Sequence, residues 1–124
     1  MKRIAWILFT ALAVAAAGST ITVGSQQSTP EIMQRKLYES QELLSALVLA
    51  QFDDIKRHAD QLDSLAEFQS WFVLPTPEYA RHSREFREAA QIIAAAGERK
   101  DAATAFDAYV SLVGTCIACH DYIR

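Results

Sequence analysis

Cysteine is scarce in this 124-residue sequence, as are proline, glycine and an excess of charge of either sign. Both cysteines lie in one short motif near the C-terminal end, so none is left for a structural disulfide. The 12 basic and 15 acidic side chains give a formal charge of −3. Nucleic acid is therefore not expected as a binding partner, because proteins that bind it need a basic surface. No strand-like alternation of apolar and polar residues occurs, which excludes βαβ folds.

The cysteines form a C-x-x-C-H motif, made of Cys116, Cys119 and the adjoining His120. This is the attachment signature of c-type haem. Two thiols three positions apart on a helix bond to the two vinyl groups of one haem, and the imidazole binds the iron. A zinc site needs a second ligand pair, and His58 and His82 are isolated from each other. The motif predicts one haem c, covalently attached through Cys116 and Cys119, with His120 as the proximal iron ligand.

The N-terminus has the pattern of an export signal. Two basic residues precede an uncharged apolar run over residues 4–17, and small residues at 15–17 suit cleavage after Ala17. Residues 1–17 are predicted to be a signal peptide. The alternative is an uncleaved anchor that extends to residue 23 and holds the protein at the membrane, facing the periplasm. Haem attachment takes place outside the cytoplasmic membrane, so an exported, periplasmic protein agrees with the motif.

Cleavage would leave 10 basic and 15 acidic side chains, a formal charge of −5. Residues 18–30 are rich in Ser, Thr, Gln and Gly and predict a flexible linker, which ends at Pro30 in the first turn of a helix. Residues 31–124 form the expected haem domain. Apolar residues recur there with helical spacing in four segments, near 31–49, 53–68, 78–96 and 102–120. Short connections predict an all-α, antiparallel, up-down-up-down four-helix bundle with covalent haem near the C-terminus of the last helix.

The spacing also predicts which helix faces are buried. Thr76 and Asp101 are expected to be helix N-caps, and Gly97 a C-cap. His58 and His82 have charged neighbours and are expected at the surface. Cys116 and His120 would continue the buried stripe of the last helix, with Cys119 one position off it. The stripes in chain order are Met33, Leu37, Leu44, Leu47 and Val48; Phe52, Ile55, Ala59, Leu62 and Ala66; Tyr79, Phe86, Ala90 and Ile93; and Ala102, Phe106, Tyr109, Val113, Cys116 and His120.

The ending Cys116-Ile-Ala-Cys-His-Asp-Tyr-Ile-Arg124 resembles that of class II cytochrome c, the cytochrome c′ group, which commonly has Asp after the His and Arg four positions after it. Residues 54–62 resemble the start of that family's second helix. The resemblance implies that Arg124 contacts the haem edge, although a terminal arginine also suits the negative end of a helix. It further implies that Arg35 or Lys36 could reach a haem propionate, and that a homodimer is possible.

The resemblance also implies that the first helix faces the sixth coordination position of the iron. Met33 there would give the His/Met pair of a six-coordinate electron carrier. Leu37 would instead cover an open iron that binds small gases, and both alternatives stand. We expect a non-enzymatic monohaem cytochrome that transfers one electron between redox partner proteins. The alternatives are a protein that binds nitric oxide or carbon monoxide, and a haem-stabilised sensor or structural domain.

Overall fold

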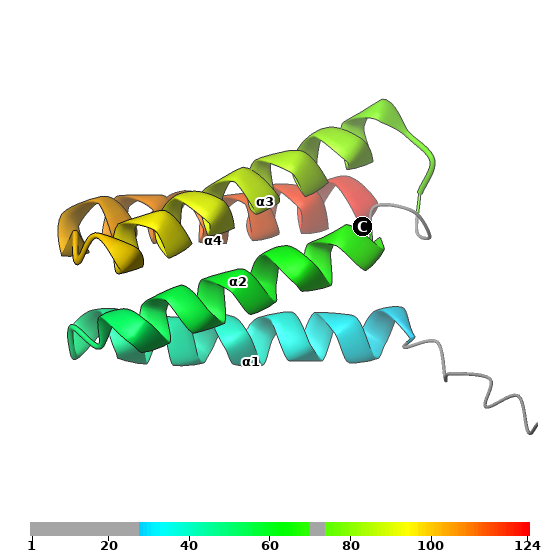
Figure 1. Cartoon of the computed structure of the whole chain (residues 1–124). Helices are drawn as coiled ribbons and strands as arrows, with labels where there is room; N and C mark the ends of the chain where they lie inside the picture. The colour runs from blue at the N-terminus through cyan, green and yellow to red at the C-terminus, as the bar shows by residue number, and fades with distance from the viewer. Residues whose placement is uncertain (1–27, 70–73) are drawn as a thin grey trace, which may run out of the picture.

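Four α-helices make up the computed structural model, which describes residues 28–69 and 74–124. They are α1 (Thr29–Val48), α2 (Phe52–Gln69), α3 (Pro77–Glu98) and α4 (Ala102–Ile123), and these residues contain no strand (Figure 1). The predicted signal peptide, the alternative anchor and nearly all of the linker lie outside the described residues. The all-helical class predicted from the sequence is confirmed.

The helix starts follow from local side-chain chemistry. The Thr76 hydroxyl accepts a hydrogen bond of 3.2 Å from the backbone N–H of Tyr79, and the Asp101 carboxylate accepts one of 3.1 Å from Thr104. Both side chains satisfy N–H groups that the first helical turn leaves without a backbone partner. The two predicted N-caps are confirmed, and Pro30 lies in the first turn of α1 as expected.

Two tight turns of the same kind join α1 to α2 and α3 to α4. Ala50 and Lys100 adopt positive φ angles of 53° and 58°, and the following N–H groups, of Gln51 and Asp101, each bond a carbonyl five residues back at 2.9 Å. Such closures reverse the chain direction within a few residues. The helices therefore alternate in direction, and Figure 1 shows the start of α1 and the end of α4 at the same end of the bundle.

Gly97 does not end α3, which contradicts the predicted C-cap. The helix continues to Glu98, and Lys100 takes the left-handed position. Gly97 is buried because α2 approaches it closely: a Cβ there would lie 3.0 Å from the backbone nitrogen of Lys56 and 3.1 Å from the carbonyl oxygen of Phe52. The glycine is thus needed for helix packing, and the turn does not require it.

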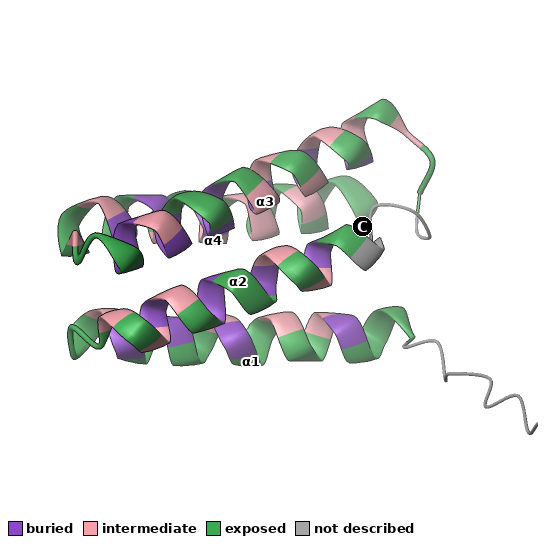
Figure 2. Cartoon of the chain, in the orientation of Figure 1, coloured by how far each residue is buried: buried purple, intermediate pink, exposed green. Residues whose placement is uncertain are grey.

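The core lies mainly between α2 and α3, where the buried stripes continue along both helices (Figure 2). The predicted inward residues of both helices are confirmed, apart from Phe52, which is half-buried. α2 packs against α1 and α3, α3 packs against α4, and of the neighbouring helix pairs α1 and α4 touch least. The fully buried side chains of α2 and α3 are Ile55, Ala59, Leu62, Ala66, Ala90, Ile93 and Ala96.

The buried face of α1 differs from the predicted one. It consists of Ile32, Glu39, Leu43 and Ala46, whereas Leu37 and Val48 are 60% and 77% exposed. α1 carries apolar residues on two faces, and only the face toward α2 is covered. The predicted stripe is therefore wrong for Leu37, Leu44 and Val48, while Met33 and Leu47 are half-buried.

The buried face of α4 is also rotated from the prediction. Ala105, Ala108 and Leu112 are buried against the core, while Phe106 is 54% exposed. Small alanines let α4 lie close to α3, and this contact selects their face over the bulkier one. Ala102 and His120 are exposed as well, contrary to the prediction. Among the helices described, α4 is the one long and apolar enough to cross a membrane, a test that some core helices also pass.

His58 is buried, which contradicts the expectation of a surface position. Its Nδ1 donates a 2.7 Å hydrogen bond to Glu39, also buried, on the neighbouring α1. Arg35 donates to the other carboxylate oxygen of Glu39 at 2.6 Å. Buried polar groups are costly unless they are paired, and this cluster pairs them across the α1–α2 contact.

Candidate functional site

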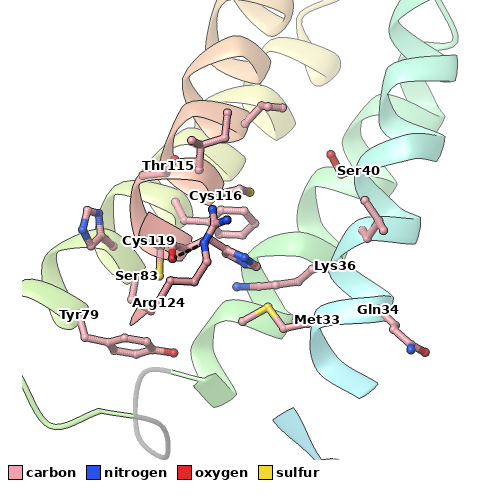
Figure 3. A pocket seen from close by; sticks show the side chains of 16 residues that line it. Met33, Gln34, Lys36, Ser40, Tyr79, Ser83, Thr115, Cys116, Cys119 and Arg124 are labelled. Carbon is pink, nitrogen blue, oxygen red and sulfur yellow. Dashed lines mark hydrogen bonds between the residues drawn. The ribbon is translucent and has the colours of Figure 1, made fainter. Parts of the chain in front are cut away.

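A cavity of about 510 Å³ opens at the end of the bundle where α1 and α3 begin and α4 ends (Figure 3). Residues of α1, α3 and α4 line it, and its open side lies between α1 and α4, which make few contacts with each other. Its walls are mostly apolar. The lining residues used below are Met33, Lys36 and Leu37 of α1, Tyr79, His82 and Phe86 of α3, and Cys116, Ile117, Cys119, His120 and Arg124 of α4.

Cys116 and Cys119 lie one helical turn apart on α4 and both line the cavity. Both are half-buried free thiols, so Cys116 is less buried than predicted and Cys119, expected one position off the inward stripe, also reaches the cavity. Burial raises the pKa of each thiol, and the opposing effect of Lys36 is smaller. Reactive redox dithiols instead have a thiol pKa that is lowered by their surroundings.

His120 and Arg124 lie at the rim of the same cavity. His120 is exposed, and its backbone carbonyl accepts a 3.1 Å hydrogen bond from Nε of Arg124 (Figure 3). The Arg124 guanidinium also donates to the Asp121 carboxylate at 3.0 Å. The structure thus brings Arg124 beside the motif, where a contact with the edge of a bound group is sterically open. That role stays a prediction.

The first helix presents Met33, Lys36 and Leu37 to the cavity. Met33 is half-buried, and in Figure 3 its side chain points the same way as that of Lys36, toward the side where Cys119 and Arg124 lie. Leu37 lines the opening and is mostly in solvent. Of the two residues proposed for the sixth position, Met33 is therefore the better enclosed.

Two buried α3 residues of the cavity have polar groups. Burial raises the pKa of Tyr79 to about 12. His82, expected at the surface, is only 4% exposed, and its Nδ1 has no hydrogen-bond partner among residues 28–69 and 74–124. Its ring lies 6.0 Å from that of Tyr122 between α3 and α4. Because arginines 81 and 84 lie on either side of it, His82 was expected in solvent, and no local pattern in the sequence indicated that it is buried.

The cavity suits a large apolar cofactor better than a metal ion held by side chains. In residues 28–69 and 74–124, no three His, Cys, Asp or Glu side chains come together as metal ligands. Cys116, Cys119 and His120 therefore do not converge on one point, and they are spread along one wall. Cofactor cavities typically have 300–1,000 Å³ and apolar linings. The residues present fit the covalent attachment of a haem.

Comparisons with protein-family models, with curated proteins and with solved structures find no match to this chain.

Proposed function

We propose that this chain is an exported monohaem c-type cytochrome that carries one electron between redox partner proteins in the periplasm. The supporting observation is the position of the C-x-x-C-H motif on the wall of an apolar, cofactor-sized cavity. Cys116 and Cys119 would hold one haem through two thioether bonds, and His120 would bind its iron. Bound there, the haem iron supplies a centre that gains and loses one electron.

The protein side chains would tune and expose this centre. Tyr79 and Phe86 are buried and exclude water from one side of the cavity, and burial is one factor that sets haem potential. Leu37 and Ile117 line the cavity and are 60% and 58% exposed. A partner protein could dock on this apolar rim and approach the haem edge, as weak and short-lived redox complexes require only a small interface.

The experiment is expression with the c-type maturation machinery and measurement of covalent haem. The purified protein should keep one haem per chain after denaturation and solvent extraction, with a matching mass increase. Replacing both Cys116 and Cys119 by Ala should abolish this. The matched control is Ala118→Ser inside the motif, which should retain the haem. Covalent haem in the double variant, or none in the wild type, would refute the proposal.

One-electron transfer has its own test. A potentiometric titration should show a single reversible one-electron step.

The mass of the purified protein should show cleavage after Ala17, and a full-length mass would favour the membrane anchor.

Gas binding is the second candidate, supported by the open side of the cavity between α1 and α4. Nitric oxide or carbon monoxide could enter there if no side chain filled the sixth position. Spectra of the ferrous protein with and without carbon monoxide separate the candidates. No change on adding the gas supports electron transfer, and a clear change supports gas binding.

A further inference from the structure

Lys36 is half-buried and differs from the other two lysines that the structure describes, Lys56 and Lys100, because its amine reaches a buried aromatic ring of the bundle. Its Nζ is 4.2 Å from the centroid of the Phe86 ring, within the range of a cation–π contact. Phe86 is buried on α3, which stands diagonally opposite α1 in the bundle. The Lys36 side chain therefore extends from one corner of the bundle into its interior, through the cavity that holds the motif (Figure 3).

The amine is also near both attachment points. Lys36, Cys116 and Cys119 line the same cavity, and the charge of Lys36 opposes the rise that burial causes in the pKa of both thiols. Whatever group joins the two thiols must extend into the space that this amine reaches. Met33 lies one turn earlier on α1, and the Leu37 side chain is mostly in solvent.

The chemistry of the buried amine suits a metal ligand. Burial is the main cause that lowers the pKa of Lys36 to about 8. At pH 7 about one amine in ten is then neutral, compared with about one in several thousand for an exposed lysine. A neutral amine has an available lone pair, and only this form can bind a metal.

We propose that Lys36 is the sixth ligand of the haem iron, on the face opposite His120. The inference rests on the proposed haem attachment and decides between the α1 residues that could complete the site. The ammonium of Lys36 would first lose one proton to solvent, and the lone pair of Nζ would then be free to hold the iron. Met33 then packs beside the haem without binding it.

A competing role for Lys36 is an ion pair with a haem propionate. The variant Lys36→Arg separates the two roles, because arginine keeps the charge and the reach but stays protonated and does not ligate iron. Lys36→Leu removes both roles and keeps an apolar filling. Met33→Leu is the matched control on the same face of α1.

The experiment compares the ferric holoproteins by visible, near-infrared and electron paramagnetic resonance spectroscopy, with covalent haem content measured in each. The wild type should be low-spin without the charge-transfer band that a methionine sulfur gives. Lys36→Leu and Lys36→Arg should become high-spin and bind added imidazole about tenfold more tightly or better, because an internal ligand no longer competes. Met33→Leu should match the wild type.

Several results would overturn the assignment. A wild-type methionine band that Met33→Leu abolishes would assign the position to Met33. A high-spin wild type would mean an open iron. If the Lys36→Arg or Lys36→Leu protein stayed low-spin, Lys36 would not be the iron ligand. Its role would then be to pair with a propionate or to pack in the cavity. The wild-type spectrum alone separates a nitrogen ligand from a sulfur ligand or an open iron, even if a variant fails to fold. Absence of covalent haem from the wild type would instead refute the proposed function as a whole, and the haem assay detects this separately.

Discussion

The α2–α3 pair is less apolar than the α1–α4 pair, yet it is the more deeply buried of the two. α1 and α4 are on average the more apolar helices, yet α2 and α3 contribute most of the fully buried side chains. Phe106, Val110 and Ile117 of α4 are exposed. Contacts within the protein thus cover the apolar residues of α2 and α3, whereas α1 and α4 border a cavity and keep an exposed apolar surface.

This difference indicates which part of the bundle is closely packed by protein side chains alone. The α2–α3 contact has close helix approach, small residues and no need of an added group. The open side depends on whatever fills the cavity beside Cys116, since an apolar cavity forfeits contacts that a bound group would restore. Substitutions in the two regions should therefore have different effects on the free energy of unfolding.

The largest effect is expected from Ile93→Ala in the packed region. Ile93 is fully buried between α2 and α3, so its truncation should lower the free energy of unfolding by about 2–5 kcal/mol. Its chain neighbour Ile92 is 49% exposed, and Ile92→Ala should change that free energy by less than about 0.5 kcal/mol. Urea titrations followed by circular dichroism measure both. Equal effects would show that the core does not lie where the structure has it.

The two glycines test the same contrast through backbone approach. Gly97→Ala places a methyl group against two backbone atoms of α2, and overpacking of this kind should cost about 1–3 kcal/mol. Around Gly114 on α4, the added group meets no described atom within 4 Å apart from its chain neighbours and the backbone of its own helix, so Gly114→Ala should stabilise the helix by about 0.5–1 kcal/mol. Thermal unfolding of the two variants should move in opposite directions. A stabilised Gly97→Ala protein would contradict the close contact of α2 and α3.

The Glu39–His58 pair should give the α1–α2 contact a pH dependence. Burial would raise the pKa of Glu39, but hydrogen bonds from His58 and Arg35 together outweigh it and hold the pKa below 4.5. A depressed native pKa stabilises the fold above pH 4.5, and this contribution is lost as the pH falls through the native value.

Glu39→Gln should therefore cost about 1–3 kcal/mol at pH 7. The difference from the wild type should shrink between pH 4.5 and lower values. Urea titrations at several pH values give both quantities. A difference that stayed constant down to pH 3 would exclude the paired carboxylate as its cause.

The smallest effect on stability is expected from Leu37→Ser at the open rim. Leu37 is mostly in solvent, so the free energy of unfolding should change by less than about 0.5 kcal/mol. The same variant should slow electron exchange with a partner protein if the rim is a docking surface. Stopped-flow kinetics measure this, and Val48→Ser, exposed far along α1, is the control. A large loss of stability would show that Leu37 is covered after all.

The sequence predicts the helices well because the signals for them are local. Thr76 and Asp101 cap their helices through the next turn, and the stripes of α2 and α3 each have a single apolar face. α1 and α4 are apolar on more than one face, so spacing alone does not tell which face is inward. Gly97 has the local sequence pattern of a helix end. Its role in packing depends on α2 residues about forty positions away in the chain, so the local pattern does not reveal it.

The candidate site divides in the same way. Cys116, Cys119 and His120 form a contiguous motif whose chemistry is readable without a fold. His82 and Lys36 are polar residues within charged surroundings, and their burial depends on Phe86 and Tyr122 from other helices. Arg124 and Met33 are both predicted through the family resemblance, and the structure brings both to the cavity.

The amino-acid sequence alone determines four helices, the N-caps of α3 and α4 and the C-x-x-C-H motif, because each depends on residues within about one helical turn of one another. Only the tertiary structure decides that α1 and α4 separate around a cavity, that His58 pairs with Glu39, and that the Lys36 amine reaches Phe86 through the interior. These features join residues from different helices, and their free energies come from burial, which no local pattern measures.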